Sequence, residues 1–311
     1  MAEVAEDYPK TLLELERRFA DEESCRDYLF ALRWPRGFVC PSCGGGKAWK
    51  MSRGLWLCGT CRHQTSVTAG TVFQDTRRSL VLWFRAMWHV TSQKNGASAL
   101  GLMRVLGLGS YETAWTWLHK LRRAMVRPGR DRLNGTIEVD ETYVGGERPG
   151  KRGRGAAGKS LVMIAAQEEG NGIGRIRLVR VANAAAASLH PAIQGSVESG
   201  SVVETDGWSG YSGLDQHGYV HRVVHPSASL GENLLPRCHR VASLLKRWLL
   251  GTHQGAVEPQ QLDFYLDEFT FRFNRRTSEY RGKLFYRLVQ QAVQVPPKPY
   301  RSLLPQPVGA G

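Results

Sequence analysis

Four of the six cysteines form two Cys-x-x-Cys pairs, a spacing that is typical of a zinc site. The pairs are Cys40 with Cys43 and Cys58 with Cys61. Because two residues between thiolates let one tight turn direct both sulfurs at a single ion, two such turns supply the four ligands of a tetrahedral Zn²⁺. A redox-active thiol pair is the alternative, and the second matched pair argues against it. With all four ligands thiolate, no position remains for water, so we predict a structural zinc ribbon.

Two aspartates occupy positions from which they could hold a divalent cation. Asp140 lies in the strand-like segment 136–144, where alternation places Asp140 and Glu138 on the same face. An acidic side chain that faces the core is costly unless it binds a metal or a partner. Asp206 directly follows the strand-like segment 201–205, and open α/β sheets place their ligand sites at such carboxyl ends. Carboxylates on neighbouring strands are suited to Mg²⁺ or Mn²⁺ and to in-line displacement at phosphorus.

A basic, glycine-rich loop over residues 145–158 follows the strand of Asp140. It lacks the spaced glycines and the closing Lys-Ser/Thr of a P-loop, so binding of a nucleoside triphosphate is rejected. Cations on such a loop suit a phosphate backbone, and a plain solvated loop is the alternative. The DNA contacts predicted from this loop are Arg148, Lys151, Arg152 and Arg154.

The elements expected to position these residues are helical before residue 128. Apolar periodicity predicts one or two short helices within residues 8–33, and the segment 76–90 is aromatic and apolar. Further helices are expected over about 97–106 and 111–126, separated by a glycine-containing turn. This arrangement matches a helix-turn-helix, whose second helix enters a major groove, and an ordinary helical bundle with solvated cations is the alternative. The cations predicted to contact DNA from that helix are Lys120, Arg122 and Arg123.

After a break at residues 127–130 the periodicity becomes that of strands. Strands are predicted over 136–144, 160–167, 174–181, 201–205 and 219–224, with helices near 184–193, 234–250, 259–273 and 284–293. Three strands, a helix, two further strands and then helices is the order of an RNase H-like α/β fold. The predicted domains are a helical segment 1–36, a zinc ribbon 37–70, a helix-turn-helix-like region 76–128, a catalytic domain 134–295 and a Pro-rich tail 296–311.

The net charge favours a polyanionic partner. The chain has 42 Lys and Arg against 28 Asp and Glu, which gives +14, and such a surplus suits nucleic acid or an anionic membrane surface. No segment reaches the roughly 18 apolar residues that a membrane span needs, and the N-terminal residues lack the pattern of a signal peptide. We therefore expect a cytoplasmic protein that does not bind membranes.

The chain resembles insertion-sequence transposases of the IS1595 family, in particular the ISXO2-like group, over nearly its whole length. The resemblance rests on the zinc ribbon and on residues 137–146, 151–155, 205–208, 244–252, 265–269 and 272–276. It implies a DDE-type catalytic domain of RNase H-like fold, in which a third metal ligand lies on a helix beyond the second aspartate. No glutamate stands at that place in this chain.

His239 occupies the third position, 33 residues after Asp206 and seven before Lys246. A spacing of seven returns a helix nearly to the same face, so both side chains can point at one site. The resemblance implies that this position is Asp or Glu in some members and Asn or His in others, with a lysine seven residues later. The predicted catalytic set is therefore Asp140, Asp206, His239 and Lys246. Because imidazole is a poorer ligand for Mg²⁺ than for Mn²⁺, His239 either ligates weakly or only positions water.

Two glutamates are alternatives for the third position. Glu232 precedes the predicted helix, and Glu268 lies within helix 259–273, where Asp267 and Glu268 are equally well explained by pairing with Arg272 and Arg275.

The resemblance implies a transposase that cuts at the ends of its element and joins the freed 3′-hydroxyl to target DNA. Lys246 and Arg247 would contact phosphates, and the ribbon with residues 97–126 would read the terminal inverted repeats. The expected partners are double-stranded DNA and, during synapsis of two ends, a second copy of the chain in a dimer or larger oligomer. A non-catalytic DNA-binding regulator and an RNase H-like nuclease without strand transfer are the alternatives.

Overall fold

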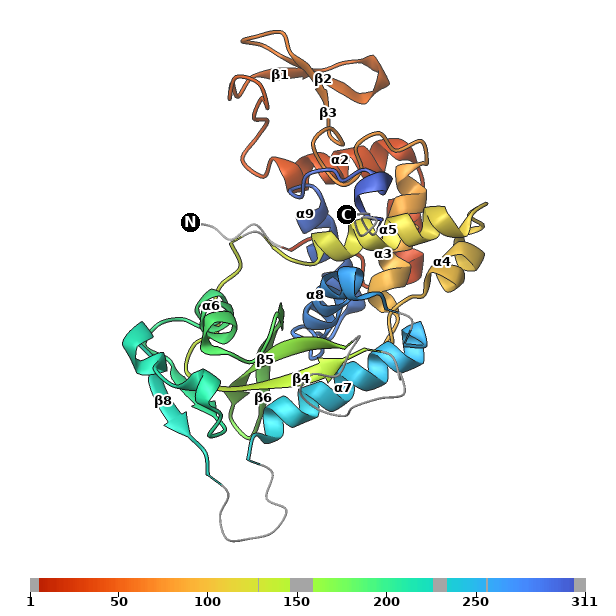
Figure 1. The fold of residues 1–311 in the computed structure, drawn as a ribbon. Helices are drawn as coiled ribbons and strands as arrows, with labels where there is room; N and C mark the ends of the chain where they lie inside the picture. Colours follow the sequence, from red (N-terminus) through yellow and green to blue (C-terminus); the bar gives the residue numbers. More distant parts are fainter. Residues whose placement is uncertain (1–5, 128, 146–158, 226–233, 256, 305–311) are drawn as a thin grey trace, which may run out of the picture. The chain divides into compact units, whose positions relative to one another are not determined.

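The computed structural model describes residues 6–127, 129–145, 159–225, 234–255 and 257–304. The chain forms two compact units, the first made of residues 1–128 with 277–311 and the second of residues 129–276 (Figure 1). The second unit is continuous in sequence, whereas the first is closed by a segment that returns from the C-terminal end of the chain.

The first unit begins with two capped helices and a small sheet. Helices α1 (Leu12–Arg18) and α2 (Glu22–Arg33) start at Thr11 and Asp21, whose side chains accept a hydrogen bond from a first-turn backbone N–H. Strands β1 (Ala48–Lys50), β2 (Leu55–Cys58) and β3 (Gln64–Ser66) then form an antiparallel sheet in the order β1-β2-β3. The helices predicted within residues 8–33 are thus present as α1 and α2.

Four further helices complete the first unit: α3 (Leu80–Ser92), α4 (Ala99–Leu106), α5 (Tyr111–Ala124) and α9 (Arg281–Ala292). Helix α4 ends at Gly107, whose φ of 61° is left-handed and suits glycine. Ser110 then caps α5 by accepting a hydrogen bond from Thr113 N–H. The short helix, glycine turn and second helix predicted for this region are therefore present.

Helix α9 lies in the first unit, so the predicted catalytic domain over 134–295 extends too far. The rings of Phe285 in α9 and Phe84 in α3 pack edge to face with centroids 5.6 Å apart, and Val72 N–H donates to Ala292 carbonyl at 3.3 Å. The apolar face of α9 is buried here, which explains why the second unit ends at residue 276. Leu303, in the segment 296–311 that is predicted as a tail, is also buried and belongs to the first unit.

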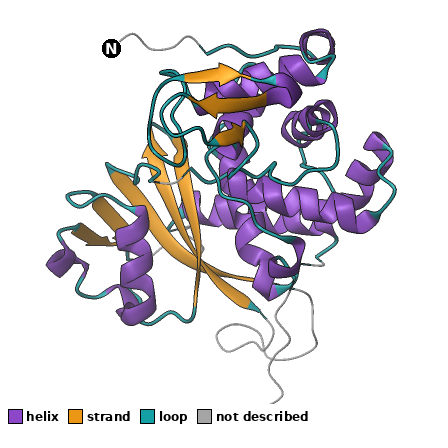
Figure 2. Ribbon diagram, turned by 90° about the horizontal axis from the view of Figure 1, so that it is seen from above, coloured by secondary structure: helices purple, strands orange, loops and turns teal. Residues whose placement is uncertain are grey.

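The second unit contains a five-stranded mixed sheet (Figure 2). Its strands are β4 (Thr136–Val144), β5 (Ser160–Glu169), β6 (Gly172–Val181), β7 (Val202–Thr205) and β8 (Val220–Val223), in the spatial order β6-β5-β4-β7-β8. Strand β5 is antiparallel to both of its neighbours, β4 and β6, whereas β7 and β8 run parallel to β4. All five predicted strands are present, and β4 has the predicted bounds.

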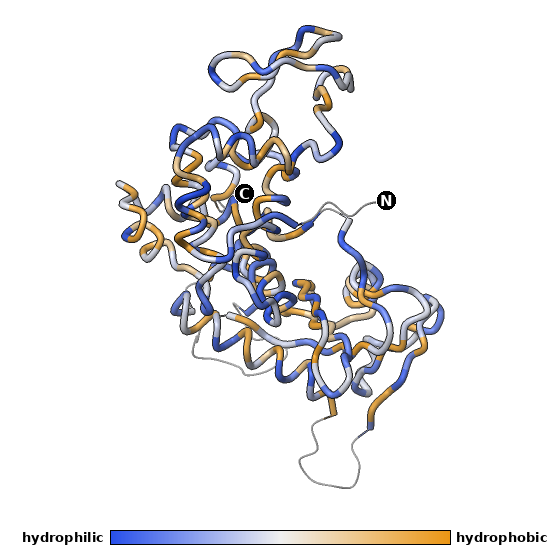
Figure 3. Tube along the Cα trace, turned by 180° about the vertical axis from the view of Figure 1, so that it is seen from behind, coloured by the Kyte–Doolittle hydropathy of each residue, from blue (hydrophilic) through white to orange (hydrophobic). Residues whose placement is uncertain are grey.

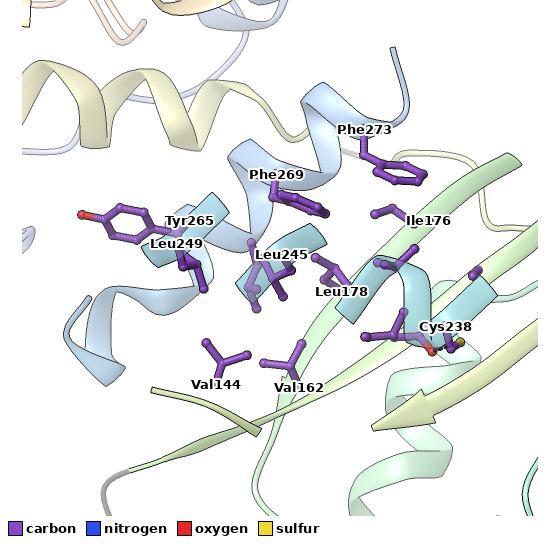
Figure 4. Packing of buried hydrophobic residues seen from close by; sticks show 14 of the residues in the cluster. Val144, Val162, Ile176, Leu178, Cys238, Leu245, Leu249, Tyr265, Phe269 and Phe273 are labelled. Carbon is purple, nitrogen blue, oxygen red and sulfur yellow. Dashed lines mark hydrogen bonds between the residues drawn. The ribbon is translucent and has the colours of Figure 1, made fainter. Parts of the chain in front are cut away.

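Helices cover both faces of this sheet. Helix α6 (Ala186–Ser196) packs on one face, over buried side chains that include Ile137 and Val139 of β4. Helices α7 (Pro236–His253) and α8 (Leu262–Phe273) pack on the other, where Leu245 and Phe269 meet Val162 (Figure 4). Hydropathy alternates along these helices, as expected for elements that bury one side (Figure 3).

Short 3₁₀ turns connect the main elements, at Ser52–Gly54, Ser209–Tyr211, Leu214–His217, Pro259–Gln261 and Tyr300–Ser302.

Candidate metal centres

The four paired cysteines converge at one end of the β1–β3 sheet. Their sulfurs all lie within 4.8 Å of one another, with Cys40 to Cys61 at 3.7 Å and Cys43 to Cys58 at 3.6 Å. Four thiolates about 2.3 Å from a central Zn²⁺ are separated by about 3.8 Å, so this donor set fits zinc. The cluster is therefore the closed, all-sulfur site that the spacing predicts.

Backbone N–H groups support two of these sulfurs. Gly45 N–H donates to Cys43 Sγ and Thr60 N–H donates to Cys58 Sγ, each at 3.4 Å. Glycine is required at position 45, because an added Cβ would lie 2.7 Å from Thr60 Oγ1. Such second-layer hydrogen bonds fix the orientation of metal ligands.

The two predicted catalytic aspartates occupy equivalent places on adjacent parallel strands. Glu138 of β4 is in register with Glu204 of β7. Asp140 and Asp206 each stand two residues further on, so both lie at the carboxyl side of this strand pair and on corresponding pleats. Neighbouring strands are separated by about 4.8 Å, a spacing that lets two carboxylates share a cation.

Each aspartate is oriented by one backbone donor. Glu141 N–H donates to Asp140 Oδ1 at 2.8 Å, and Trp208 N–H donates to Asp206 Oδ1 at 3.0 Å. Burial raises the pKa of Asp140 to about 6, and the charges of Glu141 and Asp206 add to that effect, against the Glu141 hydrogen bond and His239. A carboxyl in this environment gains from a nearby divalent cation, which offsets the cost of its charge.

Helix α7 brings His239 to Asp140. Nε2 of His239 lies 3.3 Å from Oδ2 of Asp140, and the imidazole remains 53% exposed. The ligand atoms of Asp140, Asp206 and His239 are not as close together as the cysteine sulfurs, since over the described ranges only the cysteines form a group within 4.8 Å.

Lys246 lies two turns further along α7. Burial and the charge of Lys159 lower the pKa of Lys246, whereas Asp140 opposes that shift. Both lysines line a cavity of about 530 Å³ at the carboxyl end of β4. Two cations that line one cavity are suited to a phosphate group, and neither Asp140 nor Asp206 lines this cavity.

Of the two alternatives for the third position, the structure describes only Glu268, and it does not support it. Glu268 is fully buried in α8, and its Oε1 accepts a hydrogen bond from Arg272 Nε at 2.8 Å. That ion pair is the one expected from the sequence, and it explains Glu268 without a metal. Glu232 lies outside the described residues.

One residue of the site was not given a role from the sequence. Glu138 is 2% exposed and accepts hydrogen bonds from the backbone N–H groups of Arg237 and Cys238 at the start of α7. Alternation already placed Glu138 on the face of Asp140, but its partners lie about a hundred positions away and leave no local signal.

The residues predicted to contact DNA differ in how accessible they are. Arg122 is 2% exposed and packed within the first unit, so it cannot reach a phosphate and is removed from the set. Lys120 and Arg123 are half-buried on α5, and Arg247 is exposed on α7. The four loop residues Arg148, Lys151, Arg152 and Arg154 lie outside the described residues.

Among the helices that the structure describes, none has the length and apolar character needed to cross a bilayer.

Comparison with known proteins identifies two domains in the chain. Residues 20–64 match the transposase zinc-ribbon domain, and residues 132–274 match the ISXO2-like transposase domain. A protein of the transposable element ISH50 from Halobacterium salinarum is 29% identical over 279 residues, which cover 82% of this chain and 92% of that relative. The first match contains all four clustered cysteines, and the second contains Asp140, Asp206 and the start of α7. The chain therefore carries, in this order, a transposase zinc-ribbon domain and an ISXO2-like transposase domain, both of the IS1595 type.

Proposed function

We propose that this chain is a DDE-type DNA transposase with an RNase H-like catalytic unit, which cuts at the ends of its element and joins the freed 3′-hydroxyl to target DNA. The register of Asp140 and Asp206 carries the proposal, because it puts two carboxylates side by side where the parallel strands end. The order of three antiparallel and two parallel strands, with helices on both faces, agrees with that fold.

Asp140 and Asp206 would hold Mg²⁺ or Mn²⁺, which stabilises the attacking and leaving oxygens of the phosphoryl transfer when bound. His239, beside Asp140, orients the attacking water or adds a nitrogen ligand. Its nitrogen favours Mn²⁺ over Mg²⁺, so Mn²⁺ is the expected better cofactor. Lys246 and Lys159 bind the phosphate that flanks the reacting one.

The first unit would recognise the DNA ends. The zinc ribbon and the α4–turn–α5 region are the elements suited to a major groove, with Lys120 and Arg123 as the cations still accessible on α5. Because transposition brings two ends together, we expect a dimer or larger oligomer on double-stranded DNA, acting in the cytoplasm.

A plasmid assay tests this function. The full chain is incubated with Mn²⁺ and a plasmid that carries both ends of its own element, and the products are sequenced. Cut ends joined to new sites support a transposase. Cutting without joining would favour a nuclease, and binding without cutting would favour a DNA-binding regulator.

A further inference from the structure

Helix α7 has no capping side chain of its own. Its N-cap residue is Leu235, which has no side-chain oxygen, and Pro236 follows at the first helical position. The backbone N–H groups at the next two positions usually bond to a capping side chain, because they have no partner within the helix. In α7 these are the N–H groups of Arg237 and Cys238.

Glu138 of β4 replaces the missing cap. Its Oε2 accepts from Arg237 N–H at 2.7 Å and from Cys238 N–H at 2.9 Å. Its Oε1 accepts from Arg237 Nη1 at 2.9 Å. A carboxylate that is 2% exposed would be costly without such donors, and three of them together with the positive end of the helix satisfy it.

Further contacts hold the first turn of α7 on the sheet. Arg237 Nη2 donates to Glu168 at the end of β5 at 2.7 Å. The Cys238 thiol donates to the carbonyl of Glu138 at 3.2 Å, and it lies among the buried side chains of the α7–α8 face (Figure 4). The first turn is therefore fixed against β4 and β5.

This connection joins the two halves of the catalytic set. Glu138 precedes Asp140 by two residues on β4, and the capped N–H of Cys238 directly precedes His239 on α7. One strand thus carries Asp140 and also fixes the helical turn that carries His239.

We propose that Glu138 is a positioning residue, which sets the distance between His239 and Asp140 by capping α7 from the strand that holds Asp140. The inference rests on the proposed function, because the distance between His239 and Asp140 matters only if these residues take part in metal-dependent cutting. Gln at position 138 keeps the size of the side chain but turns an amide NH₂ toward groups that are all donors. The amide oxygen can still accept from the two backbone N–H groups, but the charge and the contact with the Arg237 guanidinium are lost, so the first turn of α7 is held less tightly on β4.

The test is a double-mutant cycle on the full chain, with Glu138→Gln, His239→Ala and the double variant. The readout is the Mn²⁺ concentration that gives half-maximal cutting of the plasmid described above. Supporting groups behind metal ligands typically change metal affinity or activity by about 10-fold to 100-fold. We expect Glu138→Gln to raise that concentration about 10-fold or more in the parent chain, and less than about threefold when His239 is already Ala.

Glu268→Gln is the matched control. It makes the same change in a fully buried glutamate that pairs with an arginine in the same unit. We expect it to lower thermal stability without changing the Mn²⁺ response. If Glu138→Gln does not fold, Glu138→Asp is used in the same cycle, because it keeps the charge and shortens the reach by one methylene.

Three results would overturn the inference. The first is a Glu138 variant that needs the same Mn²⁺ concentration for half-maximal cutting as the parent chain. The second is an equal change in that concentration with and without His239. The third is an unchanged concentration in His239→Ala, because His239 would then have no role that depends on its position. Failure of the proposed function would give a different result. In that case Asp140→Ala would still cut the plasmid fully, whether position 138 is Glu or Gln.

Discussion

At the scale of residues, two buried carboxylates two positions apart on β4 have opposite environments. Glu138 is surrounded by three donors and is satisfied within the protein. Asp140 has one backbone donor and an adjacent acidic residue, so burial raises its pKa to about 6. The charged carboxylate of Asp140 therefore lowers the stability of the folded protein when no cation is bound to it.

The pKa of Asp140 predicts how stability depends on pH without metal. The folded pKa of about 6 exceeds the ordinary value of 3.8, so the folded state binds more protons between these values and stability falls as pH rises through that window. Asp140→Asn removes this titration. We expect the variant to be more stable than the parent by roughly 2 kcal/mol at pH 7, with no advantage at pH 3.5, in denaturant titrations with chelator.

Adding Mn²⁺ is the control for that comparison, since it should stabilise the parent and leave Asp140→Asn unchanged. An Asn variant that is less stable than the parent at pH 7 would contradict this account of Asp140.

Residue patterns predicted the cysteine cluster better than they predicted burial. The cysteine spacing fixed four ligands because one ion dictates that geometry, and strand alternation placed Asp140 correctly. Arg122 was misassigned because a cation on a helix gives no sign of which face is buried. Glu138 was missed because its donors come from α7, and only the folded chain brings the two together.

At the scale of elements, strand β6 is an edge strand whose outer side is covered by side chains. Asn274, just after α8, accepts from Ile176 N–H at 2.7 Å and donates to Ile176 carbonyl at 3.1 Å. Arg276 donates to the Gly174 carbonyl at 3.2 Å. The amide imitates a neighbouring strand, which protects the edge from pairing with another chain. This gives a structural role to residues 272–276, which carried part of the family resemblance.

Replacing Asn274 should therefore weaken the second unit. We expect Asn274→Ala to lower the free energy of unfolding by about 1–3 kcal/mol, because both groups of Ile176 lose their partner. Asn134→Ala is the matched control: its Oδ1 bonds Gln167 Nε2 at an exposed position, so the change should cost less than about 0.5 kcal/mol. Equal effects in denaturant titrations would show that the Asn274 pair does not hold the edge.

The ribbon depends on its metal more than on its core, because three strands of three or four residues bury little. We expect one zinc per chain by elemental analysis, and a chelator should unfold residues 37–70. Cys43→Ser should lose the zinc. Cys25→Ala, in a buried cysteine outside the cluster, should retain it. A chain without Cys43 that still binds one equivalent tightly would rule out the four-thiolate site.

The bounds of elements could be predicted where the pattern was long. The alternation of β4 over nine residues gave its ends, and the periodicity of α5 gave its start. The unit to which α9 belongs could not be predicted, because an amphipathic helix shows that one face is buried and does not show against what.

At the scale of the whole molecule, the chain forms a first unit that is discontinuous in sequence and a second unit that is continuous. Truncation after Arg276 tests this arrangement. The shortened chain lacks α9, whose buried Phe285 and Leu288 belong to the core of the first unit. Hydrogen exchange should show lost protection in α3 and retained protection in β4 and β5. Retained protection in both units would mean that α9 is dispensable.

The net charge of +14 also belongs to this scale. Nearly all of it lies in the first unit, which has 24 Lys and Arg against 12 Asp and Glu, whereas the second unit has 18 against 16. Substitutions should therefore be able to remove cutting without weakening DNA binding. We expect the clearest examples at Asp140 and Asp206.

The most direct measurement of the central claim is a gel assay of cutting and binding with Asp140→Ala and Asp206→Ala. With Mn²⁺ and DNA carrying the element's ends, we predict that each variant loses cutting and joining below detection while it binds an end fragment as tightly as the parent chain does. If either variant still joins ends to target DNA, these carboxylates do not hold the catalytic metal and the proposed mechanism is wrong.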